Sequence, residues 1–183
     1  MREACRFLST LNTTPGHGPA ALEKAFELYP EVKVFVVAHL YGTPGKIDEI
    51  REICDRHGAT IIEDAAESLG ATYKGVQTGT FGTYNCISFN GNKIITGSSG
   101  GMLLTDDEEA ANKVRKWSTQ SRENAPWYQH EELGYNYRMS NVIAGVVRGR
   151  VPVSGRAYRP EKSDLRAVQR RIQRSSGQHE SIR

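Results

Sequence analysis

The stretch "VKVFVVAHLYGTPGKIDEIREICDRHGATIIED", Val32–Asp64, decides the fold class of this 183-residue chain. It opens on "VKVFVVAHL", a nearly continuous apolar run that is typical of a strand buried on both faces of a parallel sheet. Its middle part, "GKIDEIREICDRHG", predicts a helix that ends at Gly58, because glycine commonly caps helix C-termini. The apolar residues of that helix fall on one stripe: Ile47, Ile50, Ile53 and Cys54. Since "ATIIED" predicts a second buried strand, the stretch indicates a parallel strand, helix, strand unit and an α/β fold.

Residues that can carry chemistry follow the expected strand ends, where open parallel sheets bind their ligands. Asp64 stands at such an end, and two alanines after it leave room for a flat ligand. "YNCISF" predicts a short strand whose last two residues are Ser88 and Phe89. Lys93 falls in the turn between this strand and the strand-like "GMLLTDD". "TYKGVQTGTFGTY" indicates a bent hairpin or loop, and "DDEEAANKVRKW" a helix whose end charges match the helix dipole. We therefore expect carboxylate, hydroxyl and lysine to converge on one edge of a mostly parallel sheet.

The composition indicates a globular protein, since 38% hydrophobic residues suffice for one ordinary core. No run of about 18 apolar residues occurs, and the N-terminus lacks the features of a secretory signal, so we expect no membrane partner and a cytoplasmic location. Three cysteines, Cys5, Cys54 and Cys86, are too far apart for a CxxC pair and are expected to be reduced thiols. The histidines show no ligand spacing, so we expect no metal site.

The net charge of +3 is unevenly distributed. Residues 151–183 carry eight Lys or Arg and three acids, a net +5, which leaves −2 for residues 1–150. A basic tail is one form of nucleic-acid arm, but Tyr158 is the single aromatic residue of this tail that could stack on bases. A solvated, disordered tail without a specific nucleic-acid partner is the favoured interpretation, with at most a marginal helix from Leu165 to Arg174.

Three segments in order, "EDAAESLGATYKG", "FGTYNCISFNGNKIITGSSGGML" and "LGYNYRMSN", resemble the DegT/DnrJ/StrS family of pyridoxal-phosphate-dependent sugar aminotransferases. The similarity runs from about Pro19 to Arg150. It implies the large domain of an aspartate-aminotransferase type fold (PLP fold type I) and a homodimer with active sites at the subunit interface. It also implies transfer of an amino group, usually from glutamate, to a nucleotide-linked keto-sugar in polysaccharide or amino-sugar biosynthesis.

The resemblance assigns roles to individual residues. Lys93 matches the lysine that forms the internal imine with pyridoxal 5′-phosphate, and a primary amine is the group that can form and exchange such a bond. Because some relatives carry histidine there and dehydrate sugars, Lys93 favours transamination. Asp64 matches the carboxylate that pairs with the pyridine nitrogen and keeps it protonated. Ser88 matches a hydroxyl donor to the cofactor phosphate.

Four further residues are expected to contact the cofactor. Asn136 of "YNYRM" is expected to reach the phosphate of the neighbouring subunit. Glu67 occupies a position where many relatives carry a ring-contacting glutamine, and an ionised acid there can accept hydrogen bonds but not donate them. His39 and Tyr41, in the loop after the first strand, are expected to face the other side of the cofactor ring.

Each of the main assignments also has a structural explanation. Asp64 could be a helix-capping aspartate, Ser88 a strand hydroxyl, and "NYRMSN" the start of a helix capped by Ser140.

Both ends of the chain lie outside the resemblance. The family fold needs further segments before Pro19, including a phosphate-binding turn at a helix N-terminus. We therefore predict three parts: a non-matching segment at 1–18, a central aminotransferase part at 19–150, and a basic, disordered or frame-shifted tail at 151–183. The alternative function is a catalytically silent remnant or an interaction module with a basic tail. The coding DNA around codons 18 and 150 distinguishes these possibilities.

Overall fold

A computed structural model describes residues 8–9 and 18–151 of the chain. The described residues form a five-stranded sheet in the order β1-β2-β3-β6-β7 and a separate two-stranded hairpin. The sheet strands are β1 (Leu8–Ser9), β2 (Val34–Ala38), β3 (Thr60–Asp64), β6 (Tyr84–Ser88) and β7 (Gly101–Leu104). The first four pair in parallel and β7 runs antiparallel to β6, which confirms the predicted mostly parallel sheet.

The predicted strand, helix, strand unit is present as β2, α2 (Ile47–His57) and β3. Its helix ends where expected: Gly58 has φ 61°, a left-handed conformation, and its N–H donates to the carbonyls of Asp55 and Cys54. All four residues of the predicted apolar stripe are buried. The unit therefore follows the sequence pattern closely, because its periodicity and its cap are both local signals.

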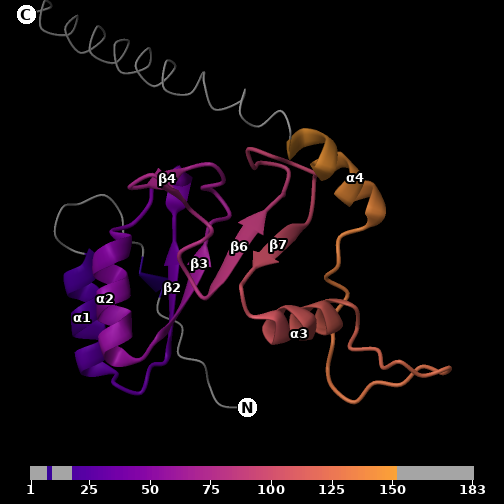
Figure 1. Cartoon of the computed structure of the whole chain (residues 1–183), viewed down its shortest axis with the longest axis horizontal. Coiled ribbons are helices and arrows are strands. Elements are labelled where there is room, and N and C mark those ends of the chain that lie inside the picture. The colour runs from indigo at the N-terminus through magenta and orange to yellow at the C-terminus, as the bar shows by residue number, and fades with distance from the viewer. Residues whose placement is uncertain (1–7, 10–17, 152–183) are drawn as a thin grey trace, which may run out of the picture.

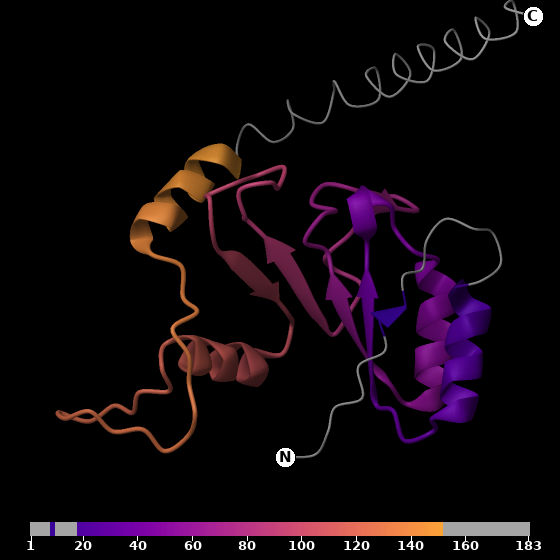
Figure 2. The same ribbon diagram turned by 180° about the vertical axis from the view of Figure 1, so that it is seen from behind.

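Helices α1 (Gly18–Leu28) and α2 lie side by side on the same face of the sheet (Figures 1 and 2). They are joined across their surfaces by Glu23, which accepts hydrogen bonds from Arg56 at 2.7 Å and pairs with His57 at 3.0 Å. The His57 ring also stacks on Phe26, with ring centroids 4.6 Å apart.

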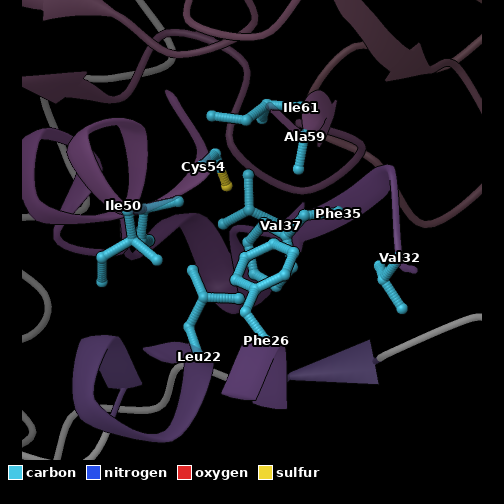
Figure 3. Packing of buried hydrophobic residues seen from close by; sticks show 10 residues of the cluster. Leu22, Phe26, Val32, Phe35, Val37, Ile50, Cys54, Ala59 and Ile61 are labelled. Carbon is cyan, nitrogen blue, oxygen red and sulfur yellow. The ribbon is translucent and has the colours of Figure 1, made fainter. Parts of the chain in front are cut away.

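The main core lies between these helices and the sheet (Figure 3). Its members are Leu22, Phe26, Val32, Phe35, Val37, Ile50, Ile53, Cys54, Ala59 and Ile61. Burial of each large apolar side chain contributes about 1.5–3 kcal/mol, so this cluster is the main source of stability for residues 18–64.

The prediction that β2 is buried on both faces is only half right. Phe35 and Val37 face the helices and are 2% and 1% exposed, whereas Val34 on the opposite face is 41% exposed. The reason is that α1 and α2 both pack on one face, and none of the helices among the described residues covers β2 from the other side.

The remaining described elements are a 3-10 turn, a hairpin and two helices, each of which is capped by a side chain. They are the 3-10 turn η1 (Leu40–Gly42), the hairpin strands β4 (Thr72–Tyr73) and β5 (Val76–Gln77), α3 (Glu108–Ser118) and α4 (Asn141–Arg150). The Asp107 side chain caps α3 by accepting from the Ala110 N–H, and Ser140 caps α4 by accepting from the Ile143 N–H. The α3 helix is confirmed, the segment predicted to be a hairpin or loop contains a hairpin, and the capping role offered as the alternative for Ser140 is present.

A second, smaller core fixes the loop between β6 and β7. Phe89 and Ile95 of that loop are buried against Val147 of α4. Gly97 is required here, because an added Cβ would lie 2.8 Å from a Val147 methyl group. Apolar contacts thus hold this loop against α4.

The carboxyl ends of β2, β3 and β6 point to one edge of the sheet, where η1, the β4–β5 hairpin, the β6–β7 loop and α4 gather (Figure 1). Over the described ranges, none of the helices has the length and apolar character needed to cross a membrane. The expectations for the basic tail concern residues 151–183, which apart from Val151 lie outside the described residues. Cys5 and most of the segment 1–18 lie outside them as well, although Leu8 and Ser9 pair with β2.

Candidate active site

A cavity of about 600 Å³ lies at the carboxyl edge of the sheet, in the size range of sites for small ligands. Its walls come from the turn after β2, the segment after β3, and β6 with its following loop. Four residues singled out from the sequence line it: Tyr41, Glu67, Ser88 and Lys93. Three segments far apart in the sequence therefore meet at the edge that the strand pattern predicted.

Lys93 extends from the β6–β7 loop and its side chain is 15% exposed. Its backbone N–H donates to the Asn90 carbonyl at 3.1 Å, which makes a turn, and two residues later Ile95 is buried in the smaller core. The amine Nζ lies 3.2 Å from Oε1 of Glu67. The loop is therefore anchored by its apolar residues while the amine lies at the cavity, in contact with a carboxylate.

Glu67 accepts from two directions. Its Oε2 accepts the backbone N–H of Tyr41 at 2.8 Å, and its Oε1 accepts from Lys93. The Tyr41 N–H first and the Lys93 ammonium second hold the pKa of Glu67 below its usual range. The carboxylate is therefore ionised at neutral pH and, as expected, acts as an acceptor.

Asp64 and Ser88 stand at the ends of β3 and β6, as predicted, and each also makes a local bond. Asp64 Oδ1 accepts the Ala66 N–H at 3.1 Å within a turn, not at the start of a helix. Ser88 Oγ accepts the Asn90 N–H at 3.2 Å. Asp64 does not line the cavity itself, but its Cα pairs in register with Cys86, two residues before Ser88. The structure therefore places Ser88 in the cavity wall, and Asp64 two residues before Ala66, which also lines the cavity.

His39 does not face the cavity, which corrects the expectation that it contacts a ligand there. It is 1% exposed, its Nε2 lies 2.9 Å from Glu63 Oε1, and its Nδ1 accepts the Gly45 N–H at 3.4 Å. The reason is strand alternation: His39 falls on the helix-covered face with Phe35 and Val37.

Glu63 is the buried partner that the sequence analysis missed. It is fully buried and also accepts backbone N–H bonds from Gly79 at 2.6 Å and Phe81 at 2.7 Å. Burial alone would raise the pKa of Glu63, but the bonds from His39 and these amides outweigh it and lower the pKa. The available signal was alternation, since Glu63 shares the buried face with Ile61 and a charge placed there must find partners.

Asn136 is not brought to the cavity. It is exposed, and it bridges Thr119 in the long segment between α3 and α4, which Figure 1 shows projecting away from the sheet. Its expected contact with a second subunit stays a prediction.

The cavity therefore combines a primary amine, an ionised carboxylate and a hydroxyl at the edge of a parallel sheet. An amine of this kind can form and exchange an imine with a carbonyl compound. The adjoining Glu67 carboxylate contacts this amine at 3.2 Å and can orient it.

The comparisons with known proteins identify the class. The profile of the DegT/DnrJ/EryC1/StrS aminotransferase family matches residues 10–156, and the chain belongs to that family. The fold is accordingly part of an aspartate-aminotransferase type architecture, PLP fold type I. The match extends beyond the predicted segment 19–150 on both sides.

Individual relatives agree with this class. EpsN of Bacillus subtilis (strain 168) is 50% identical over 144 residues. Its name describes it, by inference, as a pyridoxal phosphate-dependent aminotransferase. That alignment covers 76% of this chain and 37% of EpsN. The GDP-perosamine synthase of Caulobacter vibrioides is 42% identical over 117 residues, covering 64% of this chain and 32% of that enzyme.

A solved structure shows the same arrangement. The X-ray structure of S. venezuelae DesV, in complex with a ketimine intermediate, has a TM-score of 0.65 and 33% identity, covering 75% of this chain and 36% of DesV. The chain thus spans about a third of the length of the relatives it matches.

Proposed function

We propose that this chain is the central part of a pyridoxal-phosphate-dependent aminotransferase that acts on a nucleotide-linked keto-sugar. The observation that carries the proposal is the Lys93 amine, held 3.2 Å from Glu67 in a cavity at the carboxyl edge of the sheet. Family membership supports the same chemistry.

The residues at the cavity fit the cofactor. The cavity is large enough for a small aromatic phosphate ester, and its wall offers an amine, a hydroxyl and an anionic edge. Lys93 would hold the aldehyde carbon, Asp64 the pyridine nitrogen and Ser88 the phosphate. The chemistry that pyridoxal phosphate supplies when bound is an electron sink for a carbanion formed on the amino donor or the sugar.

The side chains of the chain have distinct tasks in this scheme. The Lys93 amine, when not engaged with the cofactor, would be placed to take up and return a proton at the substrate carbon. Asp64 would face the ring nitrogen, where a carboxylate favours the protonated ring. Glu67 accepts hydrogen bonds from the two sides of the cavity that it touches and orients the amine.

The substrate class rests on the relatives. They include GDP-perosamine synthases and a dTDP-3-amino-3,4,6-trideoxy-alpha-D-glucose transaminase from Streptomyces venezuelae, which is 35% identical over 138 residues. We infer that this chain likewise serves a nucleotide-linked sugar, with glutamate as amino donor, in a cytoplasmic homodimer. The exposed position of Asn136 is compatible with a contact across a subunit interface.

Reductive trapping tests the proposal. The protein is incubated with pyridoxal 5′-phosphate, reduced with borohydride and digested, and the modified peptide is mapped by mass spectrometry. We expect the main adduct on Lys93, its loss in Lys93→Ala, and its retention in Lys74→Ala, since Lys74 pairs with Asp48 away from the cavity. A dominant adduct on any other lysine contradicts the assignment and favours the silent-remnant alternative.

A further inference from the structure

One carboxylate joins two sides of the cavity. Glu67 accepts the backbone N–H of Tyr41 at 2.8 Å through Oε2 and the Lys93 ammonium at 3.2 Å through Oε1. Each partner lies 26 residues from Glu67 in the sequence, in opposite directions. The turn after β2 and the loop after β6 are therefore linked through a single side chain.

The Tyr41 side of this link is strained. Tyr41 has φ 53° and ψ 31°, in the left-handed region where a residue with a Cβ atom pays a steric cost. Tyr41 is 91% exposed as a residue, so packing of the ring does not hold the backbone there. The bond from its N–H to Glu67 is a charge-assisted contact that favours this conformation.

The Lys93 side is rigid by comparison. Its loop is anchored by Phe89 and Ile95, both buried against α4, and the Lys93 side chain is 15% exposed. Glu67 is 33% exposed at its side chain. A change at the amine is therefore transmitted toward the Tyr41 turn, which has fewer buried contacts, and not toward the clamped loop.

We propose that Glu67 is a positioning residue that couples the charge of Lys93 to the conformation of the Tyr41 turn at the cavity mouth. While the amine is an ammonium, Glu67 is held between its two partners and fixes the turn. When the charge is lost, Oε1 loses its ionic partner, the carboxylate reorients, and the turn is held less firmly. The geometry alone carries this coupling; only the identity of the carbonyl compound that would remove the charge rests on the proposed function.

Amide hydrogen exchange at Tyr41, measured by NMR on the full chain without ligand, tests the coupling directly. In Lys93→Met the Tyr41 amide should exchange about fivefold faster than in the wild type, the size expected for loss of a partly exposed ion pair. In Glu67→Ala it should exchange about tenfold faster or more, because the charged acceptor itself is gone. Glu67→Gln, which keeps one acceptor oxygen, should fall between the wild type and Glu67→Ala.

Two controls separate coupling from general loosening. Lys74→Met removes the same charge from an ion pair outside the cavity and should leave Tyr41 unchanged. The amides of Phe35 and Ile61 in the main core should exchange equally slowly in all variants. If Lys93→Met leaves Tyr41 exchange at the wild-type rate, the coupling is wrong. If the wild type fails to form an imine with pyridoxal 5′-phosphate while Lys93→Met still accelerates Tyr41, the proposed function fails and the coupling stands.

Discussion

Replacement of Glu63 by glutamine should remove a large part of the stability of this chain. The buried carboxylate accepts from His39 at 2.9 Å, Gly79 at 2.6 Å and Phe81 at 2.7 Å. In Glu63→Gln one oxygen becomes an NH₂ group that faces a donor, and the remaining bonds lose their charge assistance. The charged acceptor is lost and one buried N–H is left unsatisfied. We therefore expect the free energy of unfolding to fall by about 2–4 kcal/mol. That is a sizeable share of the roughly 5–15 kcal/mol by which a domain is stable.

Urea unfolding at neutral pH, followed by circular dichroism, measures this cost. The matched control is Glu49→Gln, which breaks an exposed ion pair to Lys46 at 3.1 Å and should cost less than about 0.5 kcal/mol. A loss below about 1 kcal/mol in Glu63→Gln would refute the view that this carboxylate holds the 79–82 segment to the sheet.

The pH dependence gives an independent check with a defined sign. The folded-state pKa of Glu63 is lowered from about 4.5, so its ionised form is favoured by folding. Its contribution is present above the unfolded pKa and is lost as the pH falls through the folded pKa. The stability difference between wild type and Glu63→Gln should therefore shrink below about pH 4.5.

Two further changes test other parts of the structure. Gly82→Ala should lower the melting temperature, since an added Cβ would lie 2.9 Å from the backbone nitrogen of Glu63. Overpacking of this kind costs about 1–3 kcal/mol. An unchanged melting temperature in a thermal scan would contradict the close approach of this turn to β3. Acidification should change Trp117 fluorescence, because its indole N–H donates to Glu132 at 3.0 Å, and Lys113, Trp117 and then Lys116 lower the pKa of Glu132 to about 2. This contact should persist down to about pH 2 in low salt and be lost at higher pH in high salt, whereas a fluorescence midpoint near 4.5 in low salt would show that the contact does not form.

Local patterns in the sequence were sufficient for several of the elements, but α1 (Gly18–Leu28) was not predicted. The stripe of α2 and its Gly58 cap were predicted, and the Ser140 cap of α4 was the structural alternative offered for "NYRMSN", because periodicity and capping depend on residues within one or two turns of each other. The turn that carries Lys93 between two strands was predicted for the same reason, from apolar runs separated by glycines.

The meeting of residues at the cavity was predicted only in outline. Parallel strands place their carboxyl ends at one edge, so the convergence of Ser88 and Lys93 follows from the order of the elements. Which side chains line the cavity depends on the face each occupies at the strand end. His39 and Tyr41 are two residues apart, yet one is buried against Glu63 and the other is exposed at the cavity, because the chain turns at Leu40.

The sequence by itself determined the class of fold, the turn that carries Lys93 and the family. Tertiary structure alone decided the partners of the two carboxylates. Glu63 binds His39 24 residues away, and Glu67 binds Tyr41 and Lys93, each 26 residues away. Such contacts leave no local periodicity, since they arise only when the sheet register and the loop paths bring distant residues within about 3 Å, where a hydrogen bond can form.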